Sequence, residues 1–110
     1  MVEFEKKLIS YLSDFQKIIS DCINNTEYKD DVAIYQRDYQ FIQQFIDSLS
    51  KEGKHADEIA KMILEPQTAK IITDYWRQGR YGDIECKGFY KLCDKVRVLL
   101  PLMIQQTSSE

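Results

Sequence analysis

Hydrophobic residues recur at helical spacing along the first part of the chain. Between about Val2 and Cys22, two rows of apolar side chains each repeat every seven positions, and Leu12 and Ile19 widen the stripe. The two rows are Phe4, Tyr11 and Ile18, and Leu8, Phe15 and Cys22. Residues at this spacing lie on one side of an α-helix. The pattern therefore predicts a helix with one wide buried face.

A second helix is predicted from about Asp31 to Glu52, after a polar stretch at 24–31 that breaks the apolar pattern. Its apolar rows are Tyr35, Ile42 and Leu49, and Val32, Tyr39 and Ile46. Three more apolar residues lie outside these rows, so the helix is either central in the fold or partly exposed for a partner. They are Ile34, Phe41 and Phe45. We expect Asp30 or Asp31 to cap the start of the helix, and Gly53 to adopt a left-handed conformation beyond its end.

Three further helices are predicted, from about Ala56 to Leu64, from Pro66 to Gln78 and from Asp83 onward. Pro66 suits the first position of its helix, because its φ angle is already helical. Gly88 lies inside the last helix, which suggests that a neighbouring backbone passes close to it. Pro101 should stop or kink that helix. The predicted inward residues are Ile59, Ala60, Ile63, Ala69, Ile72, Trp76, Ile84, Phe89, Leu92, Cys93, Val96, Leu99 and Leu100.

The whole pattern is that of a helical protein. No stretch alternates between apolar and polar residues for long enough to predict a β-strand, and only 4 Gly and 2 Pro are present. With 110 residues, of which 44% are hydrophobic, the chain is long enough to form one core. The sequence therefore predicts an all-α protein, a single-domain antiparallel helical bundle of four to five helices. We expect residues 1–104 to form this domain and residues 105–110 to be a frayed tail.

The residue types that support catalysis or metal binding are few and widely spaced. The single histidine, His55, lies in a polar connector, and an acidic pair follows it at a helix start, where negative charge favours the helix dipole. Cys22, Cys86 and Cys93 do not have the spacing of metal ligands. Glycine-rich phosphate loops and nucleophile motifs do not occur. We therefore expect a protein that is not an enzyme, with no catalytic residues, no cofactor and no metal.

The sequence indicates a cytoplasmic protein. Its first residues are charged from Glu3 onward, unlike a signal peptide. Its longest apolar runs are 98–100 and 102–104, far shorter than the roughly 20 residues of a membrane-spanning helix. An odd number of cysteines without a disulfide pattern favours a reducing compartment. We expect no membrane association, and thiols that pack as small apolar groups.

Charge is distributed unevenly along the chain. The 15 basic and 18 acidic residues give a net charge of −3. Residues 1–69 hold 8 basic and 13 acidic side chains, whereas residues 70–98 hold 7 basic and 4 acidic ones. Either the two regions pair with each other within the bundle, or each forms a recognition surface for another molecule.

The candidate recognition residues fall into two groups. In the first, acidic residues are interleaved with tyrosines, which provide contact area at low entropic cost. This group is Asp21, Glu27, Tyr28, Asp30, Asp31, Tyr35, Asp38 and Tyr39. The second group, Arg77, Arg80 and Tyr81, lies at the end of the fourth predicted helix and in the loop after it, and has the composition of interface hot spots. Tyr81 could instead fold back over the end of the bundle.

These features favour a protein-binding module whose partner is a basic protein. The leading hypothesis is a small acidic inhibitor, of the immunity-protein or antitoxin type, that neutralises a cognate basic enzyme such as a nuclease toxin. It predicts a monomer or weak homodimer. One alternative is a DNA-binding or phage-type transcriptional regulator that uses the fourth and fifth helices, with Lys87 and Lys91 exposed on the fifth, although the acidic net charge disfavours nucleic acid. Another is a self-associating structural or adaptor protein that buries Ile34, Phe41 and Phe45 across a dimer.

Overall fold

Five α-helices make up the part of the chain that the computed structural model describes, residues 3–73 and 83–108. They are α1 (Glu3–Asn25), α2 (Lys29–Ser50), α3 (Ala56–Ile63), α4 (Pro66–Thr73) and α5 (Asp83–Ser108). No β-strand occurs in these two ranges. The prediction of an all-α helical bundle is therefore confirmed.

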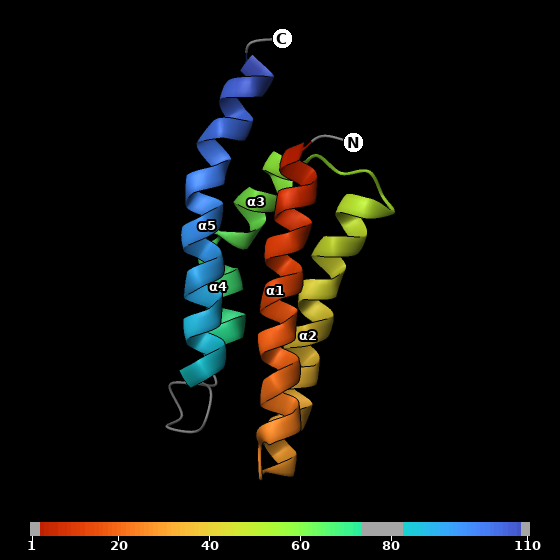
Figure 1. Cartoon of the computed structure of the whole chain (residues 1–110), viewed down its shortest axis with the longest axis vertical. Helices are drawn as coiled ribbons and strands as arrows, with labels where there is room; N and C mark the ends of the chain where they lie inside the picture. The colour runs from red at the N-terminus through yellow and green to blue at the C-terminus, as the bar shows by residue number, and fades with distance from the viewer. Residues whose placement is uncertain (1–2, 74–82, 109–110) are drawn as a thin grey trace.

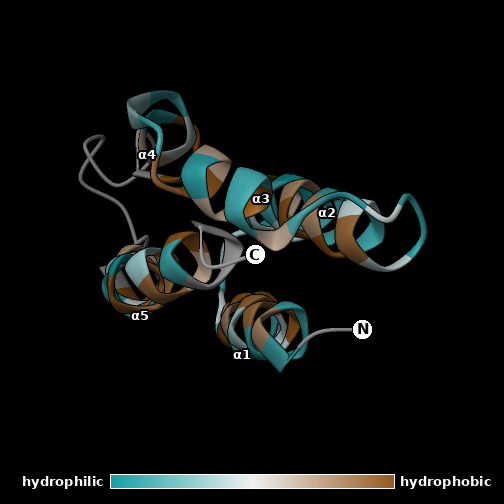
Figure 2. Cartoon of the chain, turned by 90° about the horizontal axis from the view of Figure 1, so that it is seen from above, coloured by the Kyte–Doolittle hydropathy of each residue, from teal (hydrophilic) through white to brown (hydrophobic). Residues whose placement is uncertain are grey.

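The helices run alternately down and up the long axis of the molecule. In Figure 1, α1 descends from the N-terminus, α2 returns beside it, α3 and α4 descend as two short pieces, and α5 ascends along the other side. Seen from above, α1 and α5 form one layer, and α2, α3 and α4 form a second layer across it (Figure 2). The hydrophobic core lies between these layers.

One continuous side of the core comes from α1. Its buried apolar residues are Leu8, Leu12, Phe15, Ile19 and Cys22. The ring of Phe15 packs on Phe89 of α5, with ring centroids 5.8 Å apart. Gly88 lets α5 approach this side, because a Cβ atom there would lie 3.0 Å from Ile18 and 3.3 Å from Phe15. The close approach predicted at Gly88 is confirmed, although side chains of α1 make it rather than a backbone.

The start of α2 differs from its prediction, whereas the residue beyond its end agrees with it. The helix starts at Lys29, with Tyr28 at the N-cap position and no side-chain capping hydrogen bond. The prediction that Asp30 or Asp31 caps the helix is therefore wrong. Both aspartates lie inside the first turn, where negative charge favours the helix dipole. After α2, Gly53 has a φ of +67°, in the left-handed region that was predicted for it.

The second descending segment is broken into α3 and α4. Pro66 begins α4 as predicted, because it cannot donate the hydrogen bond that would continue α3. The hydroxyl of Thr68 donates a hydrogen bond of 2.7 Å to the Met62 carbonyl oxygen, which satisfies a carbonyl at the end of α3. Ile72 is buried as predicted. The predicted core position of Trp76 lies outside the described residues.

At the start of α5, the residues that face the core differ from those that the apolar pattern predicts. Ile84, predicted inward, is 65% exposed, whereas Glu85 and Cys86 are buried. The buried row of α5 runs back from Phe89 by three and four positions, which reaches Cys86 and Glu85. Ile84 lies five positions before Phe89 and therefore faces the other way.

Pro101 does not end α5. The helix continues to Ser108, so of the two predicted outcomes, a stop or a kink, the stop is wrong. Residues 105–108 of the predicted tail belong to this helix. Leu99 and Met103, on either side of the proline, are buried in the core. This packing keeps the helix continuous where the proline removes one backbone hydrogen bond.

Candidate functional site

Three acidic side chains lie inside the bundle rather than on its surface. Asp31 and Asp38 of α2 are 0% exposed, and Glu85 of α5 is 1% exposed. We call these three residues the carboxyl cluster. An ionised carboxylate is costly to bury unless an opposite charge and hydrogen bonds compensate it. The groups around the cluster therefore decide how the fold tolerates it.

Arg37 supplies an opposite charge to the cluster. Its Nε and Nη2 atoms donate hydrogen bonds of 3.0 and 2.9 Å to Oδ1 of Asp38. Nη2 also donates a hydrogen bond of 3.0 Å to the backbone carbonyl oxygen of Ile71, across the gap between α2 and α4. Arg37 thus neutralises a buried carboxylate and fastens α2 to α4.

Glu85 carries a proton inside the cluster. Burial raises the pKa of Glu85 to about 10, the hydrogen bond with Asp38 and the charge of Asp38 act in the same direction, and Arg37 opposes them. Burial also raises the pKa of Asp38, against the hydrogen bonds from Glu85 and Arg37 and the charge of Arg37. At neutral pH, Glu85 therefore holds a proton, while the charge of Arg37 and its hydrogen bonds favour the ionised form of Asp38. Within the described ranges, Asp38 Oδ2 and Glu85 Oε1 are buried without a hydrogen-bond partner.

A cavity of about 340 Å³ opens where the α1–α2 turn meets the start of α5, and we call it the tip pocket. Its lining residues are Cys22, Asn25, Thr26, Glu27, Tyr28, Tyr35 and Ile84. Tyr28 is 46% exposed and Ile84 is 65% exposed, so both lie at its mouth. Cys22 and Tyr35 are buried and form its inner wall. None of the described residues in this lining is a lysine or an arginine.

The inner wall of the tip pocket lies in a negative electrostatic field. Burial raises the pKa of the Cys22 thiol to about 11, and the charges of Glu85 and Asp21 raise it further. Burial likewise raises the pKa of the Tyr35 hydroxyl, with smaller contributions from Cys22 and from all three members of the carboxyl cluster. These shifts show that the wall disfavours another negative charge. Burial disfavours a positive charge there as well, whereas the Coulombic contributions of the nearby carboxylates favour it.

Four of the predicted recognition residues are exposed at the turn between α1 and α2. They are Asp21, Glu27, Tyr28 and Asp30, and we call them the acidic tip. The acidic tip lies at the lower end of the bundle in Figure 1, where α1 ends and α2 begins. Glu27 and Tyr28 also line the tip pocket, so the exposed surface and the cavity form one site.

The other predicted recognition residues are not on this surface. Asp31, Tyr35 and Asp38 are 1% exposed or less, so the prediction that they dock a partner at the surface is wrong. Tyr39 is partly buried against the core, and its backbone carbonyl accepts a hydrogen bond of 3.3 Å from Gln16. The predicted loop residues Arg77, Arg80 and Tyr81 lie outside the described residues.

A sequence signal for the buried carboxyl groups was present but was not recognised. The inward positions of α2 are 31, 35, 38, 42, 45 and 49, which follow each other by steps of four and three. Asp31 and Asp38 continue the apolar row of Tyr35, Ile42 and Leu49. Because carboxylates are rarely buried, their residue type pointed to the surface while their spacing pointed to the core.

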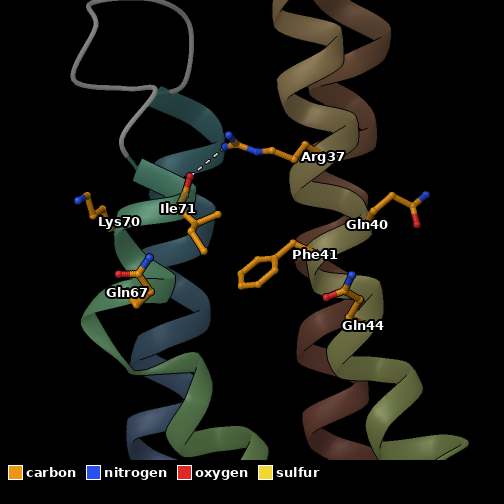
Figure 3. Close-up of a pocket in the computed structure, with 7 residues that line it drawn as sticks. All are labelled: Arg37, Gln40, Phe41, Gln44, Gln67, Lys70 and Ile71. Carbon is orange, nitrogen blue, oxygen red and sulfur yellow. Dashed lines mark hydrogen bonds between the residues drawn. The ribbon is translucent and has the colours of Figure 1, made fainter.

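A wider groove of about 590 Å³ lies between α2 and α4 (Figure 3). Its lining residues are Arg37, Gln40, Phe41, Gln44, Gln67, Lys70 and Ile71. The side chains of Phe41 and Ile71 point toward each other across the groove, and Arg37 spans it to the Ile71 carbonyl. Gln40 and Lys70 point away from it. The groove therefore has a narrow apolar floor that Arg37 crosses at one end.

The described residues give little support to a metal site, a disulfide or a membrane-spanning helix. Among them, no group of three or more histidine, cysteine, aspartate or glutamate side chains is arranged to hold a metal ion. Cys22, Cys86 and Cys93 are free thiols and all are buried, as predicted. In the same ranges, no helix combines the length and apolar content needed to cross a lipid bilayer.

Comparison with protein-family models, with curated proteins and with solved structures found no match to this chain. What the protein does is therefore inferred from its own residues, of which the acidic tip, the tip pocket and the carboxyl cluster are the most distinctive.

Proposed function

We propose that this protein is a protein-binding module that docks a basic protein at its acidic tip. The observation that carries the proposal is the exposure of Asp21, Glu27 and Asp30 around Tyr28 at one end of the bundle. Residues 21–30 contain these three acidic side chains and a single basic one, Lys29. A concentrated negative charge accelerates the encounter with a positively charged partner, and an exposed tyrosine provides contact area.

The turn that carries the acidic tip is well ordered by local hydrogen bonds. The Thr26 amide donates a hydrogen bond of 3.0 Å to the Cys22 carbonyl, and the Tyr28 amide donates one of 3.3 Å to the Thr26 hydroxyl. Nδ2 of Asn25 donates a hydrogen bond of 2.7 Å to the Asp21 carbonyl. A turn that is already ordered loses little conformational entropy when a partner binds it.

The shape of the molecule favours an inhibitor among proteins that bind basic partners. The bundle measures 51 × 24 × 18 Å, and the acidic tip lies at one end of the long dimension (Figure 1). A narrow, negatively charged end can enter an enzyme cleft that binds a polyanion, because lysine and arginine line such clefts. We therefore propose an inhibitor of the immunity-protein or antitoxin type, whose target is a basic enzyme such as a nuclease.

The experiment that tests this function reverses the charge of the acidic tip. The test variant carries Asp21→Lys, Glu27→Lys and Asp30→Lys. The control variant has the same change in net charge from Glu52→Lys, Glu58→Lys and Glu65→Lys, all exposed positions outside the tip. Wild type, test and control proteins are used to capture partners from the cells that make this protein, and bound proteins are quantified by mass spectrometry.

Wild type and control should capture the same basic protein, and the test variant should retain at least tenfold less of it. With that partner purified, charge reversal should slow association, and the difference should shrink as salt is added, because exposed charges are screened. Equal capture by the test variant, or the absence of any basic protein from the wild-type sample, contradicts the proposal.

A further inference from the structure

We propose that the tip pocket accepts one lysine or arginine side chain of the basic protein that docks at the acidic tip. This inference rests on the proposed function, and it adds the location and the chemistry of a single anchoring residue. The size of the pocket, the composition of its walls and its charge each support it.

The size of the tip pocket suits one long side chain. Its volume of about 340 Å³ is near the lower end of the range of about 300–1,000 Å³ that is typical of small-ligand sites. It is a local cavity between the end of α1, the start of α2 and the start of α5, and not an extended groove. A helix or strand of a partner would cover its mouth, whereas a single side chain can enter it.

The walls of the tip pocket match the two parts of a lysine or arginine side chain. Ile84 and the rings of Tyr28 and Tyr35 provide an apolar surface for the methylene groups. The same aromatic rings attract a positive charge through their faces. Glu27 and Asn25 also line the pocket, and they add a carboxylate and a side-chain amide to its walls.

The charge of the site is negative and is not balanced from within the lining. Glu27 lines the pocket, and Asp21 acts on the Cys22 thiol of its inner wall. Among the described residues of the lining there is no lysine or arginine, and Arg37 is held by Asp38 on the side of α2 that faces α4. A bound metal ion is the weaker explanation, because the described side chains form no metal-ligand group.

The first experiment measures binding of short capped peptides to the full-length protein by two-dimensional NMR. The probes are acetyl-Gly-Lys-Gly-amide and acetyl-Gly-Arg-Gly-amide. Their matched controls contain norleucine or citrulline, which keep the chain length but lack the charge. We expect the charged peptides to shift the signals of Thr26, Tyr28 and Ile84 and to bind at least tenfold more tightly than the neutral ones. Equal binding of charged and neutral peptides overturns the proposal, as do shifts confined to other surfaces.

The second experiment fills the pocket with a charge from the chain itself. In Ile84→Lys, the new ammonium group is placed at the mouth and can occupy the pocket, so peptide binding should fall at least tenfold. The matched control is Val98→Lys, which adds the same charge at a 72% exposed position of the same helix. Val98→Lys should bind the peptides within about twofold of wild type. Equal losses in both variants show a long-range charge effect and overturn the pocket as the binding site.

The two proposals can fail separately. If reversal of the acidic tip abolishes capture of the basic protein but Ile84→Lys does not weaken it, the docking surface stands and the pocket is not its anchor. If the peptides bind in the pocket but charge reversal leaves capture unchanged, the pocket binds cations and the proposed docking surface is wrong.

Discussion

Asp30 and Asp31 are neighbours in the first turn of α2, yet they belong to different parts of the molecule. Asp30 is exposed in the acidic tip, whereas Asp31 is 0% exposed in the carboxyl cluster. Consecutive residues of a helix point about 100° apart, so one step along the chain is enough to move a carboxylate from solvent to core. The same residue type therefore has two roles here.

The acidic tip and the carboxyl cluster differ in how strongly their charges affect the free energy of unfolding. Water and mobile ions solvate the acidic tip, so its charges cost the fold little and remain free to attract a partner. The carboxyl cluster has lost its water, and Arg37 and a proton on Glu85 compensate for that loss. We therefore expect substitutions in the cluster to change the free energy of unfolding, and substitutions in the tip to change association.

The largest effect is expected from Arg37→Ala. This change leaves Asp38 buried without its counter-charge and removes the hydrogen bond to Ile71, so the free energy of unfolding should fall by about 3 kcal/mol. Urea denaturation measures the change. The control is Lys70→Ala at an exposed position of α4, expected to change stability by no more than about 0.5 kcal/mol.

A double substitution shows whether this loss comes from the buried charge. In an Asp38→Asn background there is no carboxylate to neutralise, so Arg37→Ala should cost clearly less than it does in the wild type. The same cost in both backgrounds would mean that Arg37 acts only through its hydrogen bond to α4.

The next effect concerns the proton on Glu85. Its pKa in the folded protein, about 10, lies above the ordinary value of 4.5, so the folded chain binds one proton more than the unfolded chain between these pH values. Stability is therefore greatest at the acidic side of this window and falls as the pH rises, by up to about 1.4 kcal/mol per pH unit. Denaturation at pH 5.5 to 7.5, below the range in which the thiols of the unfolded chain ionise appreciably, measures this slope.

Glu85→Gln removes the titrating group but keeps a hydrogen-bond donor for Asp38. We expect this variant to have a flatter pH dependence and to be more stable than wild type at pH 8, by about 2 kcal/mol. The control is Glu58→Gln at an exposed position, which should keep the wild-type slope. An unchanged slope in Glu85→Gln would show that another group holds the proton.

The contrast between the acidic tip and the carboxyl cluster also shows which features can be predicted from the sequence and which cannot. Apolar spacing alone was sufficient for the all-α bundle and for most of its core, because buried rows such as Leu8, Leu12 and Phe15 repeat locally. The burial of Asp38 and Glu85 could not be predicted in this way. It depends on a contact between α2 and α5, which are far apart in sequence, and on Arg37, whose side chain turns toward α4.

The tip pocket could not be predicted from the sequence for a related reason. Its lining comes from the end of α1, the start of α2 and one residue of α5. The acidic and aromatic composition of 21–30 pointed to a surface, but not to a cavity. Ile84 joins that cavity only because α5 turns Glu85 inward and Ile84 outward, the reverse of what hydrophobicity predicts at these two positions.

A smaller difference in the free energy of unfolding is expected between substitutions of the neighbouring residues Asp30 and Asp31. Asp31→Asn alters a fully buried side chain whose charge acts on Tyr35, and we expect it to lower the free energy of unfolding by about 1.5 kcal/mol. Asp30→Asn, one residue earlier, is expected to cost about 0.5 kcal/mol, the usual contribution of a charge near a helix terminus. Thermal denaturation of the two variants at one pH and ionic strength is the measurement. Equal losses would mean that the exposed and buried aspartates are not distinct in function.

The smallest effects should come from the tip, where they should also differ in sign. Asp30 lies at the positive start of α2, whereas Asp21 lies near the negative end of α1. Asp30→Asn should therefore lower stability and Asp21→Asn should raise it, each by about 0.5 kcal/mol or less, and high salt should reduce both changes. Each substitution removes one negative charge from the tip, so both should slow association with a basic partner. A variant that is more stable but binds more slowly would show that the tip keeps its charge for binding, whereas a loss above about 1 kcal/mol in both variants would place these carboxylates with the buried cluster.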